Sequence, residues 1–314
     1  MITKRLFLGG LTATAGLPMA ARAGDNEFVR VPLTIGRAGR VRIAVTINDN
    51  GPFNFVVDTG AYSSGILDSL AKTLKLPFLE GRTQVGIGGE NIQSIYSAKK
   101  VVLGGKFTQK DVALGGIGRL GTAEEGLLAA GFLTSLPSEL DYGLSEARIY
   151  VKGQPSLDGY VPVKSYINGE DRFSSPQIFV FATIDGIPLR LNVDTGSPAA
   201  LLIFPSVVKA HGLWNKYGEG QASKSTGVTG DSVPAREVVM PDFTLSDISI
   251  PRLPVKLMDP NGHQDSMGVD GLLGAGFLKM FCMAVSHTGV AFRPNAQTVI
   301  SAGAAASSDS AQKP

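Results

Sequence analysis

Cysteine is nearly absent from this chain, since Cys282 is the single thiol among 314 residues. One cysteine cannot form an intrachain disulfide, and it cannot supply the several thiolates of a structural zinc site. Histidine is also scarce, because only positions 211, 263 and 287 carry it and no His-Glu-x-x-His spacing occurs. We therefore expect neither a metal ion nor a cofactor, and we interpret Cys282 as a small buried hydrophobe.

Long apolar runs are missing as well. Beyond the first 23 residues, no stretch reaches the ~20 apolar residues that a membrane-spanning helix needs. Neither sign of charge dominates, because 29 Lys and Arg stand against 27 Asp and Glu. Three of the basic residues and no acidic ones lie in that first segment, so the remainder has 26 basic and 27 acidic side chains. This balance argues against a nucleic-acid partner or binding to an anionic membrane.

Residues 1–23 have the pattern of an export signal. Lys4 and Arg5 precede a mostly apolar segment, and a small-x-small triplet at residues 21–23 is typical of a signal-peptidase site. The apolar segment is too short to favour an uncleaved anchor. Residues 3–8 also resemble a twin-arginine signal with lysine in the first position, and the sequence does not decide between the two export routes. We expect the mature protein in the periplasm or outside the cell.

The composition of the remaining chain favours strands and turns. It is rich in glycine and proline, 39 and 18 in the whole sequence, and has few long helical periods. We divide it into an N-terminal lobe at residues 28–151, an interlobe connection at 152–175 and a C-terminal lobe at 176–295. Residues 296–314 are mostly small and polar, and we expect a disordered tail there.

One stretch of this chain occurs twice. Residues 53–60 read Phe-Asn-Phe-Val-Val-Asp-Thr-Gly and residues 189–196 read Leu-Arg-Leu-Asn-Val-Asp-Thr-Gly, each after a proline. In both copies an apolar strand ends in an acidic residue, Asp58 or Asp194, which is out of place there unless a carboxylate is needed. The glycine that follows permits a sharp turn and a close approach to the site.

Two such aspartates have a defined chemistry when they meet. Carboxylates within a few ångströms of each other cannot both ionise cheaply, so they share one proton and titrate as a pair. The ionised member can take a proton from a water molecule, and the protonated member can donate to the carbonyl oxygen that this water attacks. Asp58 and Asp194 are therefore candidates for a pair that hydrolyses amides without a metal ion or a covalent intermediate.

The duplicated Val-Asp-Thr-Gly resembles the active-site loops of aspartic proteases, both pepsin-like and retropepsin-like. Gly86-Ile87-Gly88-Gly89 resembles the glycine-rich tip of a retropepsin flap. The short helix-like segments after each motif are similar to those of bacterial retropepsin-like proteins. The resemblance extends over residues 40–293.

Two further segments resemble the hydrophobic-hydrophobic-Gly element that wraps the catalytic loop in this family, and they lie at residues 126–133 and 271–278. Two positions depart from the pattern. Ala129 stands where the element has glycine, and Ala61 follows the first motif where Ser197 follows the second. Alanine at position 61 is normal for retropepsins, whereas Ala129 puts the packing of the first lobe in question.

The resemblance implies an all-β, bilobal acid-protease fold, with two β-barrel lobes related by pseudo-twofold symmetry and carrying short helices. It implies that Asp58 and Asp194 hold the catalytic water. It also implies that the motif threonines brace the two loops and that the motif glycines leave room for water and substrate. These supporting residues are Thr59, Gly60, Thr195 and Gly196.

Local patterns predict where the elements of each lobe lie. Residues 66–76 and 205–211 are expected to be short helices. Residues 83–97 fit a flap hairpin with its tip at 88–91, and residues 226–237 fit a second hairpin with its turn at 229–231. Residues 116–121 match Gly-x-Gly-x-x-Gly, but no βαβ pattern surrounds them, so we do not expect a dinucleotide site.

We therefore predict an exported aspartic endopeptidase that hydrolyses extended polypeptide segments, bound by main-chain hydrogen bonds. Because both motifs are in one chain, we expect a monomer. The alternative is a non-catalytic module that binds peptides or proteins in the same cleft, and a weaker one is an exported β-rich structural protein. Intact aspartates in both halves argue against the last.

Overall fold

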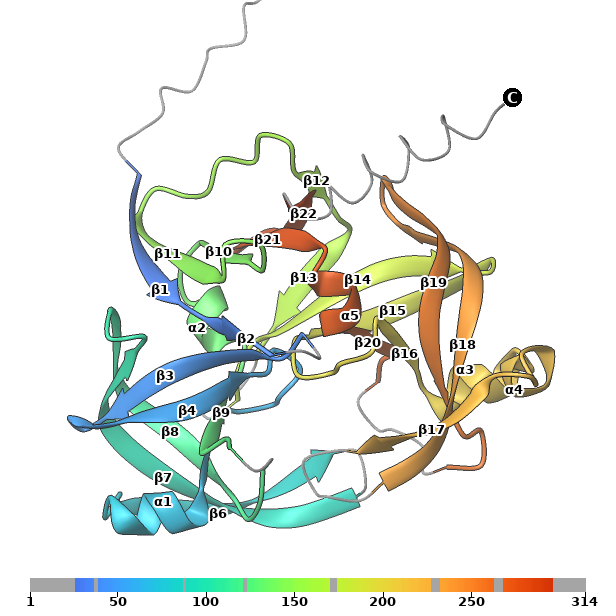
Figure 1. The fold of residues 1–314 in the computed structure, drawn as a ribbon. Helices are drawn as coiled ribbons and strands as arrows, with labels where there is room; N and C mark the ends of the chain where they lie inside the picture. The colour runs from blue at the N-terminus through green and yellow to red at the C-terminus, as the bar shows by residue number, and fades with distance from the viewer. Residues whose placement is uncertain are drawn as a thin grey trace, which may run out of the picture.

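The computed structural model describes residues 26–36, 39–86, 89–120, 123–169, 174–226, 232–262 and 268–295. Most of these residues lie in β-strands, arranged as two lobes and a third sheet (Figure 1). The expected export signal and C-terminal tail lie outside the described residues. Within the described chain, no helix has the length and apolar character required to cross a membrane.

The first lobe is a closed barrel. Strand β3 pairs with both β4 and β7, which joins the two ends of the sheet. The barrel strands, in the order of their pairing, are β3 (Val41–Ile47), β4 (Asn50–Val57), β9 (Gly126–Leu128), β5 (Gly65–Leu67), β8 (Phe107–Ile117) and β7 (Gly89–Leu103). This lobe also contains β2 (Thr34–Ile35), β6 (Phe78–Gly86), α1 (Asp68–Thr73) and α2 (Gly131–Thr134).

The second lobe repeats this plan, with β14 pairing to both β15 and β18. Its barrel strands, again in pairing order, are β14 (Gln177–Ile184), β15 (Ile187–Asp194), β20 (Gly271–Gly274), β16 (Leu201–Ile203), β19 (Ile248–Met258) and β18 (Ser232–Leu245). The other elements are β13 (Ser165–Asn168), β17 (Gln221–Thr226), α3 (Pro205–Ala210), α4 (Leu213–Lys216) and α5 (Ala275–Leu278). The bilobal all-β fold with short helices is therefore confirmed.

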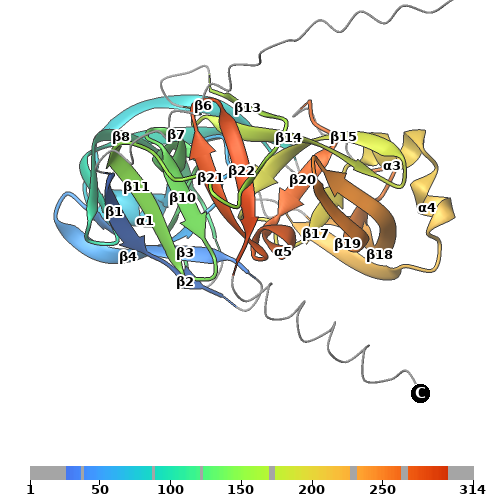
Figure 2. The ribbon, with the colours of Figure 1, turned by 90° about the horizontal axis from the view of Figure 1, so that it is seen from above.

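A third sheet combines strands from both halves of the chain. Its order is β1 (Glu27–Pro32), β11 (Glu146–Lys152), β10 (Ser138–Asp141), β21 (Phe281–Ser286), β22 (Gly289–Pro294) and β12 (Val161–Pro162). The two halves meet at the antiparallel pair β10 and β21, where Leu140 lies opposite Met283. Seen from above in Figure 2, β1, β11 and β10 lie over the first lobe and β21 and β22 lie toward the middle, so this shared sheet spans the junction of the lobes.

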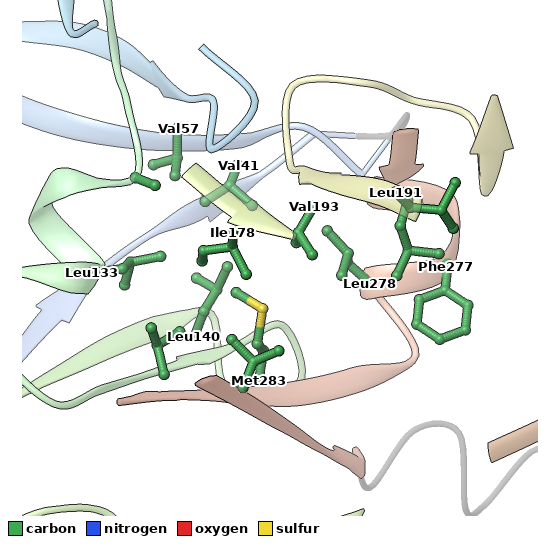
Figure 3. Close-up of a cluster of buried hydrophobic side chains, with 14 of the residues drawn as sticks. Val41, Val57, Leu133, Leu140, Ile178, Leu191, Val193, Phe277, Leu278 and Met283 are labelled. Atoms are coloured by element: carbon green, nitrogen blue, oxygen red, sulfur yellow. The ribbon is translucent and has the colours of Figure 1, made fainter. Parts of the chain in front are cut away.

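The core beneath the two motifs is built from all three sheets. Val57 and Val193, which end the apolar strands before the motifs, are fully buried. Figure 3 shows them above Leu140 and Met283 of the shared sheet, which are 0% and 2% exposed. Burying a side chain of this size contributes about 1.5–3 kcal/mol. The motifs therefore rest on a packed support rather than on free loops.

A polar cluster ties the shared sheet together. Glu139 is 3% exposed and accepts hydrogen bonds from the hydroxyls of Tyr150 and Tyr160, both over 2.6 Å. Arg148 Nη1 donates to the same carboxylate over 3.1 Å. Because these three side chains surround the carboxylate with hydrogen-bond donors, the buried charge of Glu139 is satisfied.

Some expected element bounds differ from those observed. The helix predicted at residues 66–76 is α1, which begins only at Asp68, because Ile66 is in β5 and pairs with Gly116 and Gly126. The helix predicted at residues 205–211 is α3, one residue shorter. The interlobe connection contains strands β12 and β13, which join the shared sheet and the second barrel.

Candidate active site

Both motifs stand at the carboxyl end of a barrel strand that runs parallel to a short neighbour. β4 is parallel to β9 and β15 to β20, so the two hydrophobic-hydrophobic-Gly elements lie beside the motif strands. The Asp58 N–H donates to the carbonyl of Leu128 over 2.8 Å. The chain then turns, because the Ala61 N–H donates to the Asp58 carbonyl over 3.2 Å and the Ser197 N–H to the Asp194 carbonyl over 3.3 Å.

The motif threonines link the two loops across the lobe junction. Thr59 Oγ1 donates to the carbonyl of Val193 over 2.6 Å and accepts from the Thr195 N–H over 3.1 Å. Thr195 Oγ1 donates to the carbonyl of Val57 over 2.7 Å and accepts from the Thr59 N–H over 3.1 Å. Both side chains are fully buried, so the four hydrogen bonds form away from water. The network fixes the distance between the loops.

The motif glycines allow each loop to approach the carboxylate of the other. A Cβ added to Gly60 would lie 2.6 Å from Asp194 Cγ, and one added to Gly196 would lie 2.5 Å from Asp58 Cγ. Any side chain at either position would displace the opposite carboxylate. The two carboxyl groups lie within hydrogen-bonding distance of each other, brought together from opposite lobes.

The environment of the pair raises both pKa values above 3.8. Burial is the largest cause for each carboxyl group, because the surrounding protein removes the water that would stabilise the charge. For Asp58, the charge of Asp194 and the hydrogen bond between the two side chains raise the pKa further. The charge of Arg40 opposes these effects at both aspartates.

The two carboxyl groups are not equivalent. Asp194 is 8% exposed, and its Oδ1 accepts from the N–H groups of Gly196 over 2.8 Å and Ser197 over 3.1 Å. These bonds and the hydrogen bond with Asp58 lower its pKa against the effect of burial. Asp58 is half-buried, and its pKa lies well above the ordinary value. With two main-chain N–H donors at Oδ1, Asp194 is the carboxyl whose charge the motif loop stabilises directly.

Two hairpins are observed where the flap hairpin and the second hairpin were expected. β6 and β7 form the first, and its last described pair is Gly86 opposite Gly89. Ile87 and Gly88 lie outside the described residues, as does the predicted turn of the second hairpin, which β17 and β18 form. Residues 90 and 91, which the pattern placed in the turn, instead pair with residues 85 and 84 of β6. In Figure 1, β6 and β7 lie at the lower left and β17 at the lower right, on the side of the molecule away from β10, β21 and β22 of the shared sheet.

Two other sequence features have structural explanations. Ala129 is fully buried, and its N–H donates to Ser64 Oγ over 3.1 Å, so the first lobe accommodates the alanine. Gly116 lies in strand β8 against Asp68 and Tyr96, whose hydrogen bond of 2.9 Å occupies the space that a side chain there would need. The Gly-x-Gly-x-x-Gly segment thus begins at the end of strand β8, and its third glycine, Gly121, lies outside the described residues.

Sequence reasoning missed three side chains near the aspartate pair. Arg40 and Gln177 each donate to a motif-glycine carbonyl. The Tyr142 hydroxyl is buried, has no hydrogen-bond partner among the described residues, and has a pKa raised by burial and by the charge of Asp194. None belongs to a motif, and only the long-range pairing of the lobes brings them to the site. The described residues contain no cluster of His, Cys, Asp or Glu suited to holding a metal ion.

Two β-barrel lobes that bring one aspartate each to a shared junction define the class of acid proteases. Comparison with known families agrees with this assignment. The model of the family described as aspartyl protease matches residues 43–132 and 180–277, one segment in each lobe and together more than half of the sequence. The chain belongs to that family. A comparison with curated proteins gave no match.

Proposed function

We propose that this protein is an aspartic endopeptidase in which Asp58 and Asp194 are the catalytic residues. The observation that carries the proposal is the hydrogen-bonded carboxyl pair, held by the threonine network and approached by a glycine from each side. Family membership supports peptide-bond hydrolysis as the type of reaction. Amide hydrolysis by such a pair needs one proton on the two carboxyls, which the unequal surroundings of Asp58 and Asp194 favour.

In the proposed mechanism, a water molecule between the carboxyls attacks the peptide carbonyl carbon. Asp194 accepts a proton from this water, while Asp58 donates its proton to the carbonyl oxygen, so a neutral tetrahedral diol forms. The diol then breaks down as one hydroxyl returns its proton to Asp58 and the leaving nitrogen receives the proton held by Asp194. The products are a carboxylic acid and an amine, and the pair returns to its starting state of protonation.

We further propose that the substrate is an extended peptide segment. A strand-like peptide can form main-chain hydrogen bonds with hairpins on both sides of the site, here β6–β7 and β17–β18. A monomer suffices, because the chain supplies both aspartates. Export to the periplasm or beyond is part of the proposal and rests on residues 1–23 alone. N-terminal sequencing of the protein from cell fractions tests it, and an intact Met1 in the exported fraction would contradict it.

The central experiment compares wild type with Asp58→Asn and Asp194→Asn on a peptide library across acidic and neutral pH. Asparagine keeps the shape of aspartate but cannot exchange the proton, so each variant should lose cleavage while remaining folded by circular dichroism. Asp111→Asn is the matched control, since Asp111 is exposed with φ of 53°, a conformation that asparagine also tolerates. Cleavage by either folded dyad variant at the wild-type rate would refute the catalytic assignment. Peptide binding without any cleavage by wild type would favour the non-catalytic alternative.

A further inference from the structure

Each motif-glycine carbonyl accepts a hydrogen bond from a side chain of the opposite lobe. Arg40 Nε donates to the Gly196 carbonyl over 3.4 Å, and Gln177 Nε2 donates to the Gly60 carbonyl over 2.8 Å. Arg40 immediately precedes β3 and Gln177 begins β14, which are the corresponding strands of the two barrels. The two contacts are therefore related by the pseudo-symmetry of the lobes, but one donor is a cation and the other is neutral.

The chain around Arg40 is built to hold it at the lobe junction. The Gly36 N–H donates to the Arg40 carbonyl over 2.8 Å, and the Gly39 N–H donates to the Gly36 carbonyl over 2.9 Å. Gly39 has φ of +79°, and a Cβ placed on it would lie 3.3 Å from the Cβ of Ala275 in α5. The loop of the first lobe thus packs against the second lobe, and this contact directs the guanidinium toward the second motif.

The guanidinium charge acts on groups from several elements. Arg40 lowers the pKa of both Asp58 and Asp194, against the larger effect of burial. Its charge also acts on Glu124, but that carboxylate is already paired with Arg42 over 2.7 Å. Tyr142, which directly follows β10, also faces the pair, and burial and the charge of Asp194 raise its pKa so that it stays neutral. Arg40 is therefore the cation that faces the dyad among the residues that the structure describes.

We propose that Arg40 is a positioning residue: its hydrogen bond to the Gly196 carbonyl braces the second motif loop and holds a fixed positive charge beside the carboxyl pair. The electrostatic part concerns the pair itself, and only its consequence for cleavage rests on the proposed function. A fixed positive charge close to two buried carboxyls favours their ionised forms. Gln177 supplies the corresponding hydrogen bond without this charge.

The test is a titration that needs no substrate. Wild type, Arg40→Gln, Arg40→Met, Arg40→Lys and Gln177→Ala are labelled at the aspartate γ-carbon, and their carboxyl NMR signals are followed with pH. The signals of the pair are assigned by their loss in Asp58→Asn and Asp194→Asn. Both neutral replacements of Arg40 should move the titration steps of the pair to higher pH. The lysine variant and Gln177→Ala should leave them at the wild-type positions, because neither changes the charge.

Two outcomes would overturn the proposal. If neither neutral variant moves the steps, the charge of Arg40 does not act on the pair. If Arg40→Lys or Gln177→Ala moves them as far as Arg40→Gln does, a change of loop geometry rather than charge is responsible. Where a peptide is cleaved, the acidic limb of the profile of kcat/KM against pH should move in the same direction as the titration. If no peptide is cleaved while the titration behaves as expected, the proposed function fails and this inference stands.

Discussion

The threonine network makes a quantitative prediction about how the lobes are held together. In Thr59→Val the shape of the side chain is nearly unchanged, but two hydrogen bonds disappear. The carbonyl of Val193 loses its donor, and the N–H of Thr195 loses its acceptor, both in a region without water. A buried polar group left without a partner costs about 1–3 kcal/mol, so two such groups should cost about 2–6 kcal/mol. This is a large fraction of the ~5–15 kcal/mol that stabilises a typical protein.

The measurement is urea unfolding followed by circular dichroism, because the single tryptophan, Trp214, lies in α4 and reports on the second lobe alone. Thr195→Val should be equally destabilising, since its bonds of 2.7 and 3.1 Å correspond to those of Thr59. Thr59→Ser keeps the hydroxyl and loses one methyl group, so it should cost only about 1 kcal/mol. Thr73→Val removes an exposed 2.9 Å bond and should remain within about 0.5 kcal/mol of wild type.

The reasoning is refuted if Thr59→Val unfolds within about 0.5 kcal/mol of wild type, a difference expected for surface changes. It is also refuted if the serine variant is as destabilised as the valine variant, because the methyl group and not the hydroxyl would then be responsible. A loss of cleavage without a loss of stability would mean that the network positions the aspartates but does not hold the lobes.

Three further predictions concern the pair and the shared sheet. Gly60→Ala should abolish peptide cleavage, because the added Cβ would lie 2.6 Å from Asp194 Cγ. Gly118→Ala should cleave normally, because a Cβ added there meets nothing within 4 Å. The pKa of Asp58 is raised above 3.8, so this carboxyl favours the folded state less as it loses its proton. In urea unfolding, Asp58→Asn should therefore gain stability relative to wild type as the pH rises above about 3.8. Glu139→Gln should lose about 1–3 kcal/mol of stability at neutral pH. Glu237→Gln, which removes the charge of an exposed carboxylate paired with Lys256, should lose less than about 0.5 kcal/mol.

The Glu139 prediction has its own pH dependence. Burial alone would raise the pKa of this carboxyl, but hydrogen bonds from Tyr150, Tyr160 and Arg148 outweigh burial and lower it. A lowered pKa means that the stabilisation is present above the ordinary value of 4.5 and is lost as the pH falls. The difference between wild type and Glu139→Gln should therefore shrink in acid. A constant difference would contradict the role of the charge, and normal cleavage by Gly60→Ala would contradict the close approach of the loops.

The sequence predicts most reliably what is encoded locally and repeated. The two Asp-Thr-Gly motifs stand at strand ends because an apolar strand, an acid and a glycine are consecutive, and duplication separates this pattern from an ordinary turn. The β6–β7 hairpin follows from glycines between alternating residues, although residues 90 and 91 pair within it and do not form its turn. How far β6 and β7 remain paired toward the turn is not specified by the local sequence pattern.

The shared sheet was not predictable in the same way. It pairs Leu140 with Met283, two residues that no local pattern relates. Glu139 looks like a surface residue in the sequence, because its tyrosine and arginine partners come from β11 and from the chain leading to β12. Arg40 belongs to no motif, and its contact with the second lobe depends on how the two barrels pack against each other. Such pairings are decided by tertiary packing.

Duplication within one chain has a consequence for the chemistry of the pair. A symmetric dimer would place the same residue on both sides of the site, so any charge near the dyad would appear twice. Here the halves differ, because Arg40 contacts the second motif loop and Gln177 contacts the first. Asp194 accepts two main-chain N–H groups at Oδ1, while Asp58 is the member whose pKa is raised well above the ordinary value. The two carboxyls therefore have unequal surroundings, which a pair that shares one proton needs if one member is to act as acid and the other as base.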